Sequence, residues 1–87
     1  MSISVAQAQQ VLQAQPFSKL LAAELLAFAA DGVALRIPIR ENVRQQNGFV
    51  HGGVVSYMAD NALTFAGGAV LGPSVVTSEY KINYVRP

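Results

Sequence analysis

The sequence contains no cysteine and no tryptophan, and only 13% of its 87 residues are charged. Without cysteine, the chain can form no disulfide, no thiolate-bound zinc site and no cysteine nucleophile. The lack of cysteine also fits a reducing compartment, so we expect a cytoplasmic protein. Residues 1–15 contain neither a Lys or Arg nor a long apolar run, and they therefore do not resemble a secretory signal peptide.

Charged groups and histidine are scarce in ways that exclude further classes of protein. Six Lys and Arg against five Asp and Glu give a net charge of +1 without a broad basic face, so we expect no nucleic-acid partner. One histidine, His51, with scattered carboxylates provides too few ligands for a metal site, and we expect neither metal nor cofactor. The sequence also lacks the G-x-S-x-G motif of a nucleophilic serine and the glycine-rich P-loop.

Apolar residues make up 52% of the chain, which excludes general disorder and indicates one small domain over residues 1–87. A chain this short buries a limited share of its surface, so this composition also suggests a partner surface or an oligomer. The most apolar stretch, Gly52–Leu71, is nearly long enough to span a bilayer. Asp60 near its centre would cost about 2.5–3.5 kcal/mol there, so we expect a buried helix and no membrane partner.

Apolar periodicity divides the N-terminal half into a short helix and a hairpin. Val5–Leu12 is rich in helix formers, and Pro16 then interrupts the helical pattern before a second short turn at Phe17–Leu21. Apolar residues alternate through Val33–Ile39, and Asp31-Gly32 just before this run is a strong hairpin signal. We therefore predict a β-hairpin formed by Leu21–Phe28 and Val33–Ile39.

The C-terminal half predicts a loop, a long helix and a last strand. Arg40–Gly48 is polar and ends in an Asn-Gly turn, and the helix that begins near Gly52 should stop at Gly72-Pro73. Val75–Pro87 alternates, with Tyr80, Ile82 and Tyr84 on one face, and is predicted to be a strand. The order of elements gives an α+β fold, with a helix laid against an antiparallel sheet.

Ser56, Asp60 and Thr64 recur every four residues, so on a helix they form one polar stripe in an apolar segment. A buried, ionised carboxylate requires hydrogen bonds or a charged partner. Two interpretations fit this spacing. Either the stripe faces a polar core network or a cleft, where Asp60 could act as a general base, or Asp60 lies on an exposed strip or caps a neighbouring loop.

His51-Gly52-Gly53 lies where the long helix begins. Glycines let a ligand approach the backbone, and the free N–H groups at a helix N-terminus favour negative charge. Such donors can hold the oxyanion of an acyl-transfer intermediate. The alternative is an ordinary helix start, in which the His51 side chain is hydrogen-bonded locally.

The stretches NGFVHGGVVSYMADNALTFAGG (47–68) and VVTSEYKINYVRP (75–87) resemble the hotdog-fold thioesterases of the PaaI-like branch, which hydrolyse acyl-CoA thioesters. The resemblance covers about Leu21–Pro87 and rests on the His-Gly-Gly turn, on Asp60 nine residues after His51, and on the Thr77–Pro87 motif. It implies a long helix wrapped by an antiparallel sheet. It also implies homodimers or homotetramers, with active sites at the dimer interface.

The resemblance implies roles for individual residues. Asp60 matches the catalytic acid, which acts as general base on water or as nucleophile on the thioester carbonyl. The backbone N–H of Gly52 matches the group that polarises this carbonyl, and Gln45, where many relatives carry Asn, would orient the water or the carbonyl. The remaining implied residues are His51 and Thr77 in the catalytic set, and Gly53, Asn47, Ser56 and Thr64 for substrate binding. In relatives, the Asp comes from one subunit and the His-Gly-Gly turn from the other.

The roles of Thr77 and of three arginines each have an alternative interpretation. Thr77 would point away from Tyr80 in a regular strand, which separates it from the face that carries the tyrosines. Arg40, Arg44 and Arg86 are candidates to bind the CoA phosphates, with ordinary surface solvation as the equal alternative.

The family's domain continues after the Arg-Pro motif with further strands, so we expect the C-terminal strands of the sheet to be missing here. The central helix would then expose apolar surface. The leading function is an acyl-CoA thioesterase. The alternatives are a non-catalytic acyl-CoA-binding or assembly module and, less favoured, a hotdog dehydratase, whose branch generally relies on a differently placed His and acid.

Overall fold

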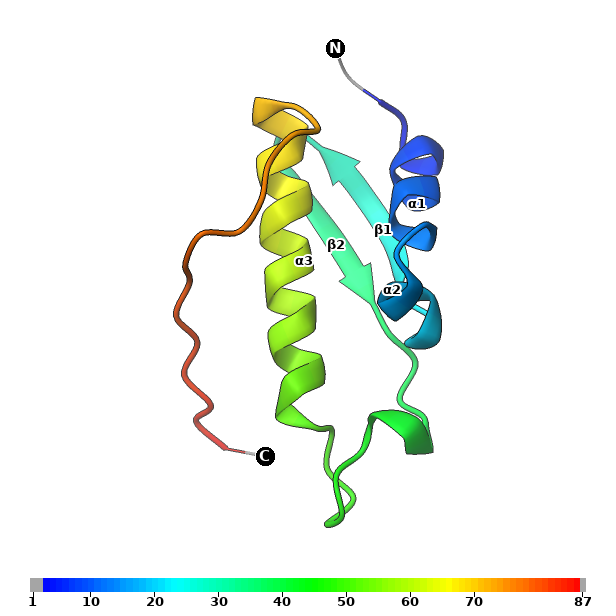
Figure 1. The fold of residues 1–87 in the computed structure, drawn as a ribbon, viewed down its shortest axis with the longest axis vertical. Helices are drawn as coiled ribbons and strands as arrows, with labels where there is room; N and C mark the ends of the chain where they lie inside the picture. Colours follow the sequence, from blue (N-terminus) through cyan, green and yellow to red (C-terminus); the bar gives the residue numbers. More distant parts are fainter. Residues whose placement is uncertain (1–2, 87) are drawn as a thin grey trace.

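A long helix packs beside a two-stranded sheet in the computed structural model, which describes residues 3–86 (Figure 1). The order of elements is α1 (Val5–Gln13), α2 (Pro16–Leu20), β1 (Glu24–Ala29), β2 (Gly32–Arg36), a 3-10 turn η1 (Glu41–Val43) and α3 (Gly52–Leu71). This arrangement is α+β, as the periodicity predicts.

The predicted hairpin is confirmed, with shorter strands. β1 and β2 pair antiparallel, and Ala29 lies opposite Gly32 across a two-residue turn. β2 ends at Arg36, two residues before Pro38, which has no backbone N–H to contribute to a ladder. Arg36 instead forms an exposed cross-strand ion pair with Glu24, 3.2 Å from Nη2 to Oε2.

Helix α1 begins with a reciprocal cap and covers the outer edge of β1. The Ser4 hydroxyl accepts from the Gln7 N–H at 3.1 Å, while the Gln7 side chain accepts from the Ser4 N–H at 2.8 Å. Gln9 Oε1 accepts from the backbone N–H of Leu25 at 2.6 Å, and Gln13 Nε2 donates to the Ala23 carbonyl at 3.2 Å. These bonds satisfy polar groups at an otherwise open sheet edge.

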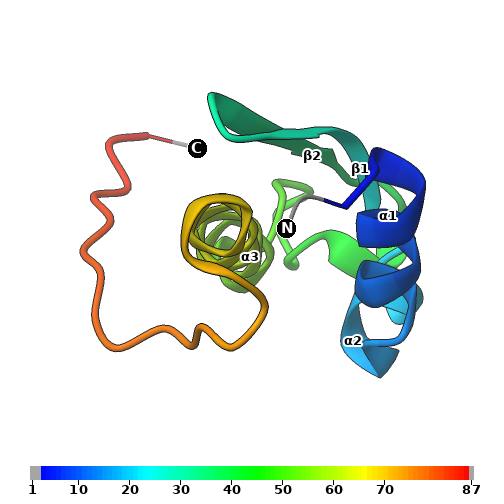
Figure 2. The ribbon, with the colours of Figure 1, turned by 90° about the horizontal axis from the view of Figure 1, so that it is seen from above.

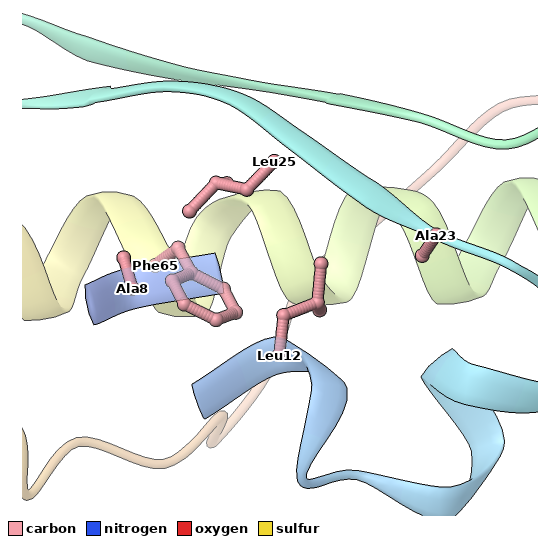
Figure 3. Close-up of a cluster of buried hydrophobic side chains, with 5 residues drawn as sticks. All are labelled: Ala8, Leu12, Ala23, Leu25 and Phe65. Carbon is pink, nitrogen blue, oxygen red and sulfur yellow. The ribbon is translucent and has the colours of Figure 1, made fainter. Parts of the chain in front are cut away.

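The core lies between α1, the hairpin and α3 (Figure 3). Leu12 and Leu25 meet Phe65 of α3 there, and Phe65 also packs edge-to-face on Phe28 with ring centroids 6.1 Å apart. Val33, Leu35 and Ile37 of the predicted alternating face contact this cluster, whereas Ile39 is 62% exposed beyond the end of β2.

Pro16 interrupts the first helix as predicted, and it also opens the second, because proline suits the first helical position. Helix α3 has the predicted limits, since it starts at Gly52 and ends at Leu71, just before Gly72-Pro73. Among the described residues, no helix combines the length and the apolar character required to cross a membrane.

The predicted last strand is not formed. Residues 74–86 have no assigned helix or strand, and they run beside α3 on a side that the hairpin does not cover (Figure 2). A strand requires a neighbouring strand to receive its backbone hydrogen bonds. Residues 3–86 provide none here, because the sheet consists of β1 and β2 alone. Pro87, the last residue of the predicted strand, lies outside the described residues.

Candidate active site

Part of the polar stripe on α3 lines a cleft. Gly53, Ser56, Tyr57 and Asp60 follow the spacing i, i+3, i+4 and i+7, which places them on one side of a helix. All four line a cleft of about 390 Å³, together with Phe17 of α2 and with Thr77 and Tyr80 of the C-terminal segment. Asp60 is half-buried there. The structure therefore places Ser56 and Asp60 of the predicted stripe at a cleft, but not Thr64.

One threonine hydroxyl holds the Asp60 carboxylate, and a second contacts the Asp60 backbone. Thr77 donates to Asp60 Oδ1, and Thr64 donates to the Asp60 backbone carbonyl at 2.9 Å. The two threonine oxygens lie 3.1 Å apart. Each threonine hydroxyl has one hydrogen, and both hydrogens are already donated to Asp60. A hydrogen bond between Thr64 and Thr77 therefore forms only when one of the two bonds to Asp60 is released. Thr77 thus reaches Asp60 even though it is seventeen residues away in the sequence.

The prediction that Thr77 points away from Tyr80 is wrong. Both side chains line the same cleft, because residues 74–86 do not follow the two-residue period of a strand. Tyr80 donates its hydroxyl to the Ser56 carbonyl at 3.2 Å. Tyr84 hydrogen-bonds the Gly52 carbonyl at 2.9 Å and lies against the Ser56 hydroxyl. The C-terminal segment is therefore docked along the whole polar stripe by side chains.

The His-Gly-Gly turn forms the N-terminus of α3. His51 is the N-cap, and its Nδ1 accepts from the Gly53 N–H at 2.8 Å, which leaves the ring proton on Nε2. The expectation of free donors is therefore wrong for Gly53, whose N–H is already bound. For Gly52, no acceptor of its N–H is recorded within residues 3–86. The turn thus presents one free backbone donor, and His51 satisfies the other.

Gln45 and Asn47 lie in the turn before His51. Gln45 Oε1 accepts from the Asn47 N–H, and the Gln45 carbonyl accepts from Gly48 at 3.0 Å. Gly48 has φ +86°, which suits glycine at this position. The predicted Asn-Gly turn is confirmed, and neither Gln45 nor Asn47 lines the cleft beside Asp60.

The turn and the carboxylate lie at different heights on α3. Gly52 and Asp60 are eight residues apart, which corresponds to about 12 Å along the helix axis. A single carbonyl group cannot contact both within one chain.

Thr64 faces a second cleft of about 680 Å³, which is lined mainly by apolar residues of α1, the hairpin end and the end of α3.

Sequence reasoning missed the aromatic residues of the cleft, which are Phe17, Tyr57 and Tyr80. Tyr57 donates its hydroxyl to Ser18 of α2. Burial raises the pKa of Tyr57 above its ordinary value of 10.0, and the hydrogen bond with Ser18 acts in the opposite direction. The sequence gives little indication of this contact, because α2 and α3 are far apart in the chain.

No group of three or more His, Asp or Glu side chains that could hold a metal ion occurs among residues 3–86. Of the three candidate arginines, Arg44 lies 3.9 Å from Glu41, with the Glu41 side chain 94% exposed. Both residues of this pair are exposed to solvent.

Comparison with known proteins adds one finding. Residues 47–87 match the family model of the thioesterase superfamily. The match includes the His-Gly-Gly turn, α3 and the C-terminal segment, and it leaves out Gln45, α1, α2 and the hairpin. No curated protein and no solved structure was found that matches the chain. The family match indicates thioester hydrolysis in general.

Proposed function

We propose that this chain is the subunit of an acyl-CoA thioesterase of hotdog fold and of the PaaI-like branch. It hydrolyses a thioester to the free acid and CoA in the cleft beside Asp60. The observation that carries the proposal is a half-buried carboxylate held by a hydroxyl at the wall of a cleft. It lies within the residues that match a thioesterase superfamily.

The residues support either of two routes. As a general base, Asp60 takes a proton from water while the water oxygen attacks the thioester carbonyl. As a nucleophile, the Asp60 carboxylate attacks that carbonyl itself and forms an anhydride, which water then hydrolyses. In both routes the C–S bond breaks, the CoA sulfur leaves as the thiolate and takes up a proton, and the free Gly52 N–H stabilises the oxyanion.

The distance between Gly52 and Asp60 supports a site built from two copies of the chain. Because about 12 Å separates these groups along α3, the oxyanion donor that acts with one Asp60 comes from the partner copy. The proposed assembly is a homodimer, or a homotetramer made of such dimers, in the cytoplasm. Gln45, Asn47 and His51 would then serve the partner's cleft together with Gly52, since all of them belong to the turn.

The other predicted residues act on the Asp60 side of this site. Thr77 orients the carboxylate through its hydroxyl, and Thr64 lies beside it on the helix, bound to the Asp60 carbonyl. Gly53 and Ser56 also line the cleft, where their small side chains leave space for the thioester.

A second candidate is a non-catalytic acyl-CoA-binding or assembly module. It is favoured by the hydrogen bond from the Gly53 N–H to His51 Nδ1, because a bound N–H is not available to an oxyanion. Such a protein binds the ligand or dimerises without releasing thiol.

The test is thiol release from short-chain, medium-chain and aryl acyl-CoAs by wild type, Asp60→Asn and Asp31→Asn. Asp31 supplies a matched control, since it is an exposed aspartate in the hairpin turn. We expect Asp60→Asn to lower kcat about 10²- to 10⁴-fold while Asp31→Asn keeps wild-type turnover. Folded Asp60→Asn with unchanged turnover would exclude the catalytic role, and binding without release by wild type would favour the module.

A further inference from the structure

The cleft beside Asp60 has an apolar wall that comes from the N-terminal part of the chain. Phe17 of α2 packs edge-to-face on Tyr57 of α3, with ring centroids 5.2 Å apart and planes at 90°. Both rings line the cleft that contains Asp60 and Thr77. The reacting groups and these rings therefore share one space.

Partly buried hydrogen bonds hold this wall in position. The Tyr57 hydroxyl donates to Ser18, which is 0% exposed, and Ser18 donates to Gln15 Oε1 at 2.6 Å. The hydrogen bond with Ser18 holds the Tyr57 ring at its hydroxyl end beside the cleft. Phe17 rests on this ring and yet remains 53% exposed, which is a large exposure for a phenylalanine on a helix that packs against the domain.

The polar groups of the cleft lie on α3 and on the C-terminal segment. The apolar part of the cleft is therefore the side formed by Phe17. The reacting carbonyl must lie beside the Asp60 carboxylate, with the acyl group on one side of it and the CoA sulfur on the other. Tyr80 directs its hydroxyl to the Ser56 carbonyl, so that wall is partly polar. An apolar acyl group lowers its free energy most by covering the exposed ring of Phe17.

Building on the proposed thioesterase function, we propose that Phe17 is a specificity-determining residue. Its ring, supported by Tyr57, binds the acyl group and favours longer apolar acyl groups over acetyl. Each methylene that the wall removes from water strengthens binding about fourfold. The preference arises from α2, which lies outside the part of the chain that matches the thioesterase superfamily.

The test compares kcat/KM for hexanoyl-CoA and acetyl-CoA in wild type, Phe17→Ala and Leu20→Ala. Leu20 is the matched control, because it lies on the same helix, is 63% exposed and does not line the cleft. We expect Phe17→Ala to lower the hexanoyl-to-acetyl ratio about tenfold and Leu20→Ala to leave it unchanged. An equal loss on both substrates would overturn the inference, since it would mean that Phe17 only supports the fold.

Two further measurements keep the outcomes separate. Calorimetry measures the binding of two non-hydrolysable thioethers, S-hexyl-CoA and S-ethyl-CoA, and so tests the role of Phe17 without any hydrolysis. If wild type releases no thiol, that result alone overturns the proposed thioesterase activity and leaves the role of Phe17 to be decided by binding. A hexyl preference in wild type that is lost in Phe17→Ala supports the inference, and no preference in wild type overturns it. If Phe17→Ala does not fold, Phe17→Gln replaces it, because glutamine keeps a long side chain and makes the wall polar. A hexyl preference equal to that of wild type in Phe17→Gln then overturns the inference.

Discussion

The N-terminus of α3 and the middle of α3 each carry one part of the proposed chemistry, and they are held in different ways. The His-Gly-Gly turn is fixed by nearby residues, since His51 binds the Gly53 N–H and donates its own N–H to Val43 at 2.8 Å. Asp60 is fixed from a distance, by Thr77 of the C-terminal segment. Changes in the turn should therefore act locally, whereas changes beside Asp60 should depend on how the segment docks.

The largest effect at the turn should come from removing the free donor. Gly52→Pro deletes one N–H at the first helical position, where proline fits, and His51 already has φ −62° and ψ 134°, which suits a residue before proline. We expect kcat to fall about 10²- to 10³-fold, with little change in the free energy of unfolding.

Gly52→Ala is the matched control for that change. It keeps the N–H and adds a Cβ that would lie 3.7 Å from the Tyr84 ring, an ordinary contact. Alanine should therefore keep most of the turnover. If Gly52→Pro is folded and as active as Gly52→Ala, the backbone N–H has no part in catalysis.

At the other region, Thr77→Val removes the hydroxyl that holds Asp60 and keeps a similar shape. We expect kcat to fall about tenfold because the carboxylate loses its orientation. Thr77→Ser should restore most of the turnover through the same hydroxyl. Steady-state kinetics of the three proteins decide this, and a Ser variant as slow as the Val variant would assign Thr77 to packing.

The smallest effect should follow loss of the helix cap. His51→Ala leaves the Gly53 N–H without its side-chain acceptor and should cost about 1 kcal/mol of the free energy of unfolding, measured in urea. His51→Asn should retain most of that stability, because asparagine is a good N-cap. Complete loss of turnover in folded His51→Asn would instead show that the imidazole acts on the substrate.

The limits of sequence reasoning are visible in two segments with the same alternation. Val33–Ile39 and residues 75–87 both alternate, and the first forms β2 because β1 lies beside it in the chain. Residues 75–86 find no neighbouring strand among the described residues, so their pattern yields a segment that docks by side chains. Local pairing can be read from the sequence, while pairing with a distant strand cannot.

The same distinction separates the site residues. The spacing correctly places Ser56 and Asp60 on one helix face, because helical geometry is local, whereas Thr64 lines the second cleft. The contact of Thr77 with Asp60 and the position of Phe17 depend on tertiary packing between segments far apart in sequence. The free Gly52 N–H agrees with the predicted helix start, whereas the bound Gly53 N–H requires knowledge of the His51 rotamer.

The most direct test of a two-copy site is to mix Asp60→Asn with Gly52→Pro after each has been shown to be folded and inactive. In a mixed dimer, one site carries both changes and the other carries neither. Random exchange of subunits should restore about a quarter of the wild-type thioester hydrolysis, which would place the carboxylate and the backbone donor on different chains. If the exchanged mixture stays inactive, the two groups do not act across two copies, and the proposed site is contradicted.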